Sequence, residues 1–349
     1  MSLNNQKPWK ILLVSLAAAV SFSMLSACSS NNNTAEDNSK AVATYKGGSV
    51  TEKEFALDQK IMKLLSPQQA QYLEIDAFKE SILKQEVGFE YLAEKASKEA
   101  KKEAEKEADA QVASLKSGLG DTYESTLKEQ GLKESDIRAY MVRVLSGYQD
   151  MLLKVTDDQV KTEFEATKGD FTVATLRHVL IQFTDANEKQ RTKEETLKLA
   201  KEVKAKLDAG EDFAEVAKKY SEDPGSKDTG GLYADKALGT YTEEFKKAAQ
   251  TLPLNTISEP VETNYGYHVM KVEKRTDKTF DQLTDEQKEG IKSSLASKGI
   301  QTFLEKGLTD LDVKINLPKS SAPADTKNSG TEPTAAPSAE APAATEAAK

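Results

Sequence analysis

Residues 263–272 read Thr-Asn-Tyr-Gly-Tyr-His-Val-Met-Lys-Val, and this stretch decides how the rest of the chain is interpreted. The run is apolar and β-prone, which favours a strand. It contains His268, one of only two histidines among 349 residues. The other, His178, lies in a second β-prone run, Arg177–Ile181. The interval that includes both histidines predicts one compact α+β unit over residues 172–275. The sequence before and after this unit predicts a helical scaffold, a membrane anchor and a tail.

Alternation and capping signals predict how this unit is built. A strand over residues 175–183 would place His178 on one face together with Leu180 and Gln182. Three helices are expected to follow, at residues 192–210, 212–220 and 242–250. Two strands are expected to close the unit, at residues 257–261 and 267–272. The last of them would place His268, Met270 and Val272 on one face.

Length and composition limit the classes of protein that fit. A chain of 349 residues suggests two or three structural units. The net charge of -9, with Lys and Glu intermixed, argues against a nucleic-acid partner, because such proteins usually carry a basic patch. The single cysteine excludes an intramolecular disulfide framework and a multi-cysteine metal site.

The N-terminus has the layout of a secretory signal peptide. Positive residues precede an apolar run that ends at Ala27, and the run is short for a membrane-spanning helix. Leu25-Ser26-Ala27-Cys28 resembles the bacterial lipobox, which implies a signal over residues 1–27 and a lipidated Cys28 as the new N-terminus. Several acyl chains would give stable anchoring. The alternative is an ordinary cleaved signal with a free cysteine. Residues 28–40 then predict a flexible tether.

Residues 41–171 predict a small hairpin turned at Gly47-Gly48 and then mostly helix. A helix capped by Ser135 is expected after a looser stretch over residues 115–131. Residues 95–110 are almost wholly Lys, Glu and Ala, so we expect a solvated helical arm with nothing to bury. Capping boxes along the whole chain are expected at Thr51–Glu54, Thr156–Gln159, Thr192–Glu195 and Thr284–Gln287.

After the unit, residues 276–317 predict a further helix and a final strand over residues 312–315. The sequence beyond Pro318 consists mainly of Ala, Pro, Thr, Ser and Glu. This composition cannot bury enough apolar surface to fold, so residues 318–349 predict a disordered tail.

Five blocks, in order, resemble the parvulin family of peptidyl-prolyl isomerases. They are Arg177–Ile181, Phe213–Ser221, Gly230-Gly231, Ile257–Val261 and Tyr265–His268. The resemblance implies a compact antiparallel-sheet domain with surrounding helices. Together with the lipobox and the helical flanks, the chain resembles the PrsA-type foldase lipoproteins of Gram-positive bacteria. That broader resemblance implies a parvulin-like domain inserted in a mostly α-helical chaperone domain made of residues 41–171 and 276–317.

Isomerisation of an X-Pro bond defines what such a site must do. The amide resists twisting over a barrier of about 18–20 kcal/mol, and the uncatalysed change takes tens to hundreds of seconds. No bond is made or broken, so no cofactor or metal is expected. The enzyme must favour the twisted amide over both planar forms. An apolar slot for the proline ring and polar groups aimed at the carbonyl would achieve this.

The resemblance assigns roles to particular residues. Its paired histidines fall on His178 and His268, and its polar position, which is cysteine or aspartate in the family, falls on Asp223. Because an aspartate cannot act as a thiol nucleophile, a non-covalent route is implied. The expected substrate-binding residues are Leu232 or Leu238 as the pocket leucine, Tyr241 at a methionine position, Phe245, Thr263 and Tyr265. The loop over residues 232–241 departs from the family's usual Leu-Gly-x-Phe and Gly-Gln-Met pattern.

Other interpretations stay open at this point. The histidines could be structural, Phe245 could be core, and Asp223 could only stabilise its turn. The chain could also be a holding chaperone with little isomerase turnover. A solute-binding lipoprotein is excluded because no large alternating βα pattern occurs. The resemblance implies secreted, non-native proteins as partners and a location at the outer face of the cell membrane, and a homodimer is compatible with it.

Overall fold

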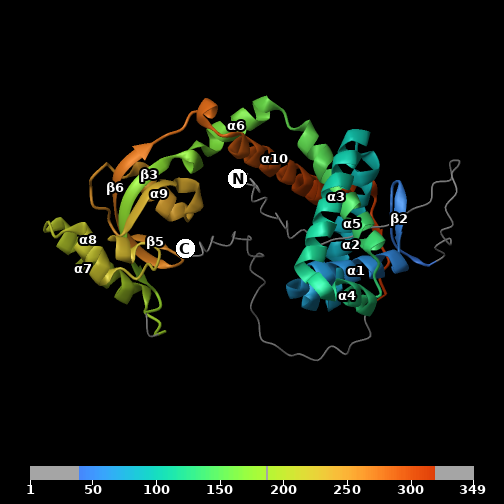
Figure 1. Ribbon diagram of the computed structural model, residues 1–349, viewed down its shortest axis with the longest axis horizontal. Helices are drawn as coiled ribbons and strands as arrows, with labels where there is room; N and C mark the ends of the chain where they lie inside the picture. Colours follow the sequence, from blue (N-terminus) through green and yellow to red (C-terminus); the bar gives the residue numbers. More distant parts are fainter. Residues whose placement is uncertain (1–38, 186–187, 319–349) are drawn as a thin grey trace, which may run out of the picture.

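The computed structural model describes residues 39–185 and 188–318. The expected signal peptide, Cys28, the tether up to residue 38 and the tail from residue 319 lie outside the described residues. Within the described ranges, no helix is both long and apolar enough to cross a membrane. Figure 1 shows two lobes that are joined by helices α6 and α10. We call them the helical lobe (residues 41–154 and 300–315) and the sheet lobe (residues 173–276).

The helical lobe combines a small sheet with five helices. Its elements are β1 (Ala41–Tyr45), β2 (Gly48–Thr51), α1 (Glu52–Leu65), the 3-10 helix η1 (Pro67–Glu74), α2 (Asp76–Lys95), α3 (Lys98–Leu119), η2 (Gly120–Thr122), α4 (Tyr123–Gln130), α5 (Glu134–Lys154), η7 (Gly307–Leu311) and β7 (Lys314–Ile315). The strands are ordered β2-β1-β7, so the last strand of the chain pairs with the first. Segments about 270 residues apart in sequence, around Ala43 and Ile315, therefore share one sheet.

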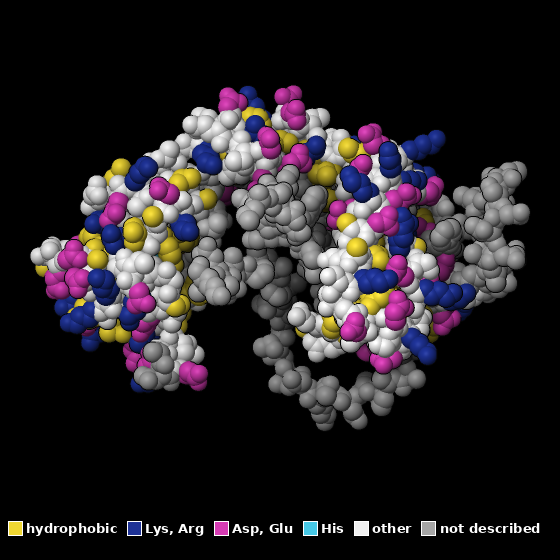
Figure 2. Space-filling model, viewed as in Figure 1, with side chains coloured by type: hydrophobic (Ala, Val, Ile, Leu, Met, Phe, Trp, Pro, Cys, Tyr) yellow, Lys and Arg dark blue, Asp and Glu magenta, His cyan; other side chains and the backbone are white. Residues whose placement is uncertain are grey.

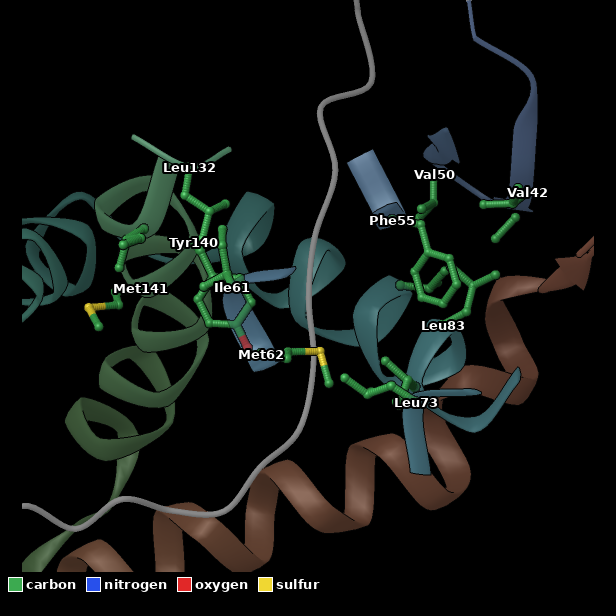
Figure 3. Close-up of a cluster of buried hydrophobic side chains, with 14 of the residues drawn as sticks. Val42, Val50, Phe55, Ile61, Met62, Leu73, Leu83, Leu132, Tyr140 and Met141 are labelled. Carbon is green, nitrogen blue, oxygen red and sulfur yellow. The ribbon is translucent and has the colours of Figure 1, made fainter. Parts of the chain in front are cut away.

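One apolar core holds this lobe together. Figure 3 shows Val42 and Val50 from the small sheet near Phe55, and Tyr140 and Met141 from α5 further along the same cluster. Partly buried side chains from the far end of the chain pack against this core, namely Phe303, Leu308, Val313, Ile315 and Leu317. Burial of apolar area is the main favourable term in folding, so the two flanking segments stabilise each other.

The expectation of a solvated arm over residues 95–110 was wrong. Helix α3 lies along α5, and one alanine per turn is fully buried at Ala100, Ala104 and Ala108. Small side chains at this spacing let two helices approach closely, so the stripe needs no large apolar residue. An ion pair from Arg138 to Asp109, with N···O 2.6 Å, adds a link between α5 and α3 at the surface.

Other local predictions had mixed outcomes. All four capping boxes are present, at Thr51, Thr156, Thr192 and Thr284. The looser stretch expected at residues 115–131 is instead the end of α3 followed by η2 and α4. Ser135 does not cap α5, because the helix already begins at Glu134 and the Asp136 carboxylate accepts from the Lys133 backbone N–H.

The two lobes are joined by α6 (Asp157–Thr167) and α10 (Asp285–Lys306), with η3 (Lys168–Phe171) and η6 (Phe280–Gln282) at the sheet-lobe end. Their contact is a separate apolar cluster in which Phe164 is fully buried. The Phe164 ring meets Phe171 and Phe280 at centroid distances of 5.4 Å and 5.8 Å. The chain thus enters and leaves the sheet lobe through one packed joint.

The sheet lobe is a four-stranded antiparallel sheet in the order β4-β3-β6-β5. Its elements are β3 (Val173–Gln182), α7 (Lys193–Asp208), α8 (Phe213–Tyr220), η4 (Lys227–Thr229), β4 (Leu232–Ala237), η5 (Leu238–Thr240), α9 (Glu243–Thr251), β5 (Val261–Thr263) and β6 (Gly266–Thr276). Helices α7 and α8 cover the face that carries Val179 and Val269, and α9 covers the face that carries Leu176 and Met270.

Two details of this sheet differ from the expectation. Strand β4 was not predicted, because Ala234, Asp235 and Lys236 have low β propensity; it forms by pairing along β3. Ile257 makes only an isolated bridge to Lys271, and the short strand after it begins at Val261. The α+β class, with a sheet unit set into a mostly helical chain, is confirmed.

Candidate active site at the paired histidines

Two central strands bring the histidines together. His178 on β3 lies opposite Met270, and His268 on β6 lies opposite Leu180. The two histidines are therefore diagonal neighbours on one face of the sheet, within reach of each other's side chains. Their Nδ1 atoms are 3.1 Å apart and their ring centroids 5.3 Å apart. Both rings are buried, with 3% and 6% of their surface exposed.

Each histidine is held at its far nitrogen by a polar side chain. The Nε2 atom of His178 is 2.9 Å from Oδ2 of Asp223 and 3.0 Å from Oγ of Ser226. The Nε2 atom of His268 is 2.9 Å from Oγ1 of Thr263. Four side chains therefore form one hydrogen-bonded row, Thr263–His268–His178–Asp223, and Ser226 donates a further bond to Asp223.

The segment before Asp223 is fastened to the edge of β3 beyond the end of β4. The Glu222 backbone N–H donates to the Leu180 carbonyl at 2.8 Å, and the Ser221 hydroxyl accepts from the Leu180 N–H at 3.2 Å. Arg191 makes two bonds of 2.7 Å and 2.8 Å to the Glu222 carboxylate. This pairing places the Asp223 carboxylate at the end of the histidine row.

The bonding partners define where the protons lie when both rings are neutral. The Asp223 carboxylate can only accept, so His178 must donate from Nε2, and its Nδ1 is then an acceptor. His268 consequently donates from Nδ1, and its Nε2 accepts from the Thr263 hydroxyl. Every donor in the row points toward Asp223. Addition of a proton to His178 would break the Nδ1–Nδ1 bond, because both atoms would then be donors. A proton added to His268 would instead occupy Nε2 and remove the acceptor of the Thr263 hydroxyl.

The electrostatics agree with this arrangement. Burial would raise the pKa of Asp223, but hydrogen bonds from His178 and Ser226 outweigh it and hold that pKa below its ordinary value. Burial, and next the charge of His178, lower the pKa of His268 to about 3. Asp223 is therefore a carboxylate and His268 a neutral ring at any pH near 7.

Aromatic side chains from β4, from the residue that follows η5 and from α9 surround the row. The Phe245 ring meets His178 and His268 edge-on at 5.4 Å and 5.1 Å. Tyr241 stacks on Phe245 at 4.8 Å, and Tyr233 stacks on His178 at 5.0 Å. Such rings prefer edge-to-face and offset contacts at these distances. The result is an apolar wall beside a buried polar row, the combination that the twisting of a prolyl amide requires.

Two glycines allow the strands to approach this closely. Gly231 has φ +76°, and a Cβ there would lie 2.3 Å from the His178 carbonyl oxygen. Gly266 opens β6, and a Cβ there would lie 2.0 Å from the Ile181 carbonyl oxygen. Any other residue would force β3 away from its neighbours, because both obstacles are backbone atoms.

Comparison with known proteins identifies the family to which the chain is similar. Residues 160–276 match the model of the PPIC-type PPIase domain. The chain is 33% identical over 298 residues to foldase protein PrsA 3 of Bacillus anthracis, covering 84% of this chain and 89% of the relative. It is 31% identical to foldase protein PrsA of Geobacillus kaustophilus, covering 86% of this chain and 92% of the relative.

The chain belongs to the PrsA foldase family. Among solved structures, the peptidylprolyl isomerase PrsA of Bacillus anthracis is 28% identical, with a TM-score of 0.40 over 64% of this chain and 92% of that one. The family model and the curated relatives confirm the resemblance drawn from the five sequence blocks, at the level of the family and of its PPIase domain.

This PrsA family member places most of the predicted site residues around the row. Leu238, Tyr241 and Phe245 form one cluster beside Met270, and Thr263 bonds His268. Tyr265 is 55% exposed at the turn before β6, where its backbone N–H donates to Thr263 Oγ1 at 3.2 Å. Leu232 is not among them. It lies opposite Arg177, so the pleat turns it to the face away from the histidines.

Two residues of the site were missed by the sequence reasoning. Ser226 is 1% exposed and touches both Asp223 and His178. Tyr233 places its hydroxyl 2.8 Å from Oδ2 of Asp223. The Asp223-x-x-Ser226 spacing within a turn was a usable signal for the serine, because a short polar side chain there can bond back to the aspartate. Tyr233 offered none, because its strand was not predicted.

The ring nitrogens of His178 and His268 are not free to bind a metal, because each is already within 3.1 Å of a protein partner. Among the residues that the structure describes, no group of three or more His, Cys, Asp or Glu side chains is arranged to hold a metal ion. Two surface depressions of about 420 Å³ and 510 Å³ lie on α8 and α7. They are on the helices of the opposite face and do not contribute to the candidate site.

Proposed function

We propose that this chain is a membrane-anchored extracytoplasmic foldase that catalyses cis/trans isomerisation of X-Pro bonds in secreted proteins. The single observation that carries the proposal is the buried row Thr263–His268–His178–Asp223 lying against Phe245 and its neighbouring rings. The row contains no thiol or amine that could act as an activated nucleophile. We therefore infer a non-covalent route.

In this route the proline ring lies against Tyr241 and Phe245, and the amide is twisted beside the histidine row. The row is fully hydrogen-bonded before the substrate binds. It therefore needs little rearrangement when the carbonyl of the prolyl amide changes its electronic character. Binding that is stronger for the twisted amide than for either planar form lowers the barrier. His178 and Asp223 keep His268 in one tautomer, and Thr263 holds its outer nitrogen.

We further propose that residues 41–171 and 276–317 form one chaperone domain around the isomerase unit 172–275. The pairing of β7 with β1 and the shared core of both flanks support this division. Figure 2 shows Lys or Arg and Asp or Glu intermixed over this face of both lobes, which suits a soluble holder of varied clients. Exposed Tyr72 (46%) and Ile75 (51%) are compatible with binding of non-native chains, or with a homodimer. Cys28 is the proposed lipidation site.

A second function is favoured by a specific observation. Both histidines are almost fully buried, and Tyr241 stacks over Phe245 where a proline ring would have to enter. If Tyr241 fills the proline-binding slot in this way, the chain would act as a holding chaperone. Its parvulin fold would then bind client proteins with little isomerase turnover. The two functions therefore differ in whether Tyr241 moves away to admit a proline ring.

A protease-coupled assay with a proline peptide tests the isomerase function. The purified chain should accelerate isomerisation, and His268→Ala should reduce kcat/KM at least tenfold because the row loses its centre. His268→Asn, which keeps a polar side chain of similar reach, controls for loss of packing, and circular dichroism confirms that each variant is folded. No acceleration by the unaltered chain, or equal rates for His268→Ala, would contradict the proposal.

Aggregation of a refolding protein, followed by light scattering, tests the chaperone function separately. A chain that lacks residues 172–275 should still suppress aggregation if the flanks form one domain. Scattering unchanged by its addition would remove the chaperone role of the flanks. Isomerase activity without this suppression, or the reverse, distinguishes the two candidate functions.

A further inference from the structure

Tyr233 contacts three residues of the proposed machinery, namely Asp223, His178 and Tyr241. Its hydroxyl lies 2.8 Å from Oδ2 of Asp223, and its ring stacks on His178 with centroids 5.0 Å apart and planes 23° apart. The ring also meets Tyr241, with centroids 5.6 Å apart and planes 42° apart. Strand β4 produces this placement, because Tyr233 lies opposite Leu176 and so shares its face with His178.

We propose that Tyr233 is a positioning residue for the Asp223–His178 pair and, through its ring, a specificity-determining wall of the proline-binding slot. The inference rests on the proposed isomerase function and adds a residue to it. The Tyr233 hydroxyl orients the Asp223 carboxylate, and this carboxylate in turn orients the His178 ring. The ring sets how wide the slot is between His178 and Tyr241.

The bonding of Asp223 supports the first half. Its Oδ2 atom receives the His178 ring, the Ser226 hydroxyl and the Tyr233 hydroxyl, and its Oδ1 accepts only the Gly225 backbone N–H at 3.1 Å. Three donors on one oxygen orient a carboxylate that hangs from a turn at the surface. They also share its negative charge, so no single donor, His178 included, receives all of it.

The surroundings of the hydroxyl are shaped for this contact. A Cβ at Gly225 would lie 3.0 Å from Oη of Tyr233, so a glycine leaves the room that the hydroxyl occupies. Burial, and next the bond to Asp223, raise the pKa of Tyr233, which keeps its hydroxyl protonated as a donor. The alternative interpretation is that β4 only places an aromatic ring here and that the Tyr233 hydroxyl bonds the nearest acceptor without a positioning role. The two interpretations differ in what removal of the hydroxyl alone does to His178.

The experiment compares Tyr233→Phe and Tyr233→Leu in the full chain. Tyr267→Phe is the matched control, because it removes a tyrosine hydroxyl that lies 2.7 Å from the Glu262 carboxylate on the opposite face of the same sheet. Tyr233→Phe should lower kcat about five- to tenfold with KM changed less than twofold, since the slot is intact. Tyr233→Leu should also raise KM for a proline peptide severalfold, because the wall is lost. Tyr267→Phe should leave both constants unchanged.

Nitrogen-15 NMR of the imidazole rings provides the readout that a purely structural role would not move. The chain has two histidines, so the ring spectra contain few signals and His268→Asn assigns them. Tyr233→Phe should shift the His178 ring nitrogens, while Tyr267→Phe should not. Unshifted rings together with an unchanged kcat would overturn the inference. If the unaltered chain does not isomerise at all, the proposed function fails, and the ring spectra still decide whether Tyr233 positions the Asp223–His178 pair.

Discussion

Replacement of Glu90 by Gln should remove much of the pH dependence of stability of the helical lobe. Glu90 lies on α2 and is 8% exposed. Burial first, and then the charges of Glu54 and Glu94, raise its pKa from 4.5 to about 8, against opposing effects of Tyr45 and Arg143. The carboxyl is thus neutral in the folded protein at pH 7 but ionised in the unfolded chain.

The sign and size of the effect follow from this difference. A folded-state pKa above the unfolded one contributes stability that is complete below pH 4.5 and is lost as the pH rises through about 8. The slope is about 1.4 kcal/mol per pH unit for one proton. Between pH 5.5 and 7.5 the loss from this group is therefore about 2.5 kcal/mol, which is a large part of a typical stability. A glutamine resembles the neutral carboxyl and has no proton to lose.

A neighbouring acid acts in the same direction. Burial, and next the charge of Asp58, raise the pKa of Glu86 well above its ordinary value, although Arg143 partly opposes this. Arg143 also pairs with Asp58 at N···O 3.3 Å. The unaltered chain should therefore lose stability with pH through both Glu86 and Glu90. Glu90→Gln should reduce the slope by one proton without abolishing it.

Urea unfolding followed by circular dichroism at 222 nm, at several pH values from 5.5 to 8.5, measures this slope. The stability advantage of Glu90→Gln over the unaltered chain should grow by about 2.5 kcal/mol between pH 5.5 and pH 7.5. Glu80→Gln is the matched control, because that acid lies on the same helix with half its side chain exposed and pairs only with Lys84. Equal slopes for Glu90→Gln and the unaltered chain would refute the reasoning.

Three further predictions follow from packing, backbone geometry and the N-terminal signal. Ala104→Leu should destabilise the chain by about 1–3 kcal/mol in urea unfolding through overpacking of α3 against α5, whereas Ala110→Leu at an exposed position should not. Gly266→Ala should sharply lower isomerase activity and thermal stability, because its Cβ meets the Ile181 carbonyl oxygen; wild-type values would contradict this. Cys28→Ser should move the chain from membranes to the medium on cell fractionation, and retention in membranes would exclude lipidation there.

Local signals in the sequence predicted those parts of the fold that depend on near neighbours. The capping boxes at Thr51 and Thr284 were predicted correctly because the two partners are three residues apart. The strands of His178 and His268 were visible as β-prone runs with a common face. Helix α3 was misjudged because burial was sought in large side chains. Its alanines become a packing surface only through α5, which is more distant in sequence.

The site residues divide in the same way. His178, His268 and Asp223 were found because they fall in recognisable blocks, while Tyr233 depends on the register of an unpredicted strand. A shift of β4 by one residue would turn Tyr233 to the face of α8 and bring its neighbour Leu232 to the histidines. The register is set at Gly231, whose carbonyl accepts from the His178 N–H at 2.9 Å and whose φ of +76° only a glycine adopts easily. The glycine pair therefore does more than turn the chain. It decides whether the residue beside His178 is a leucine or a tyrosine, and so whether Asp223 receives its third donor.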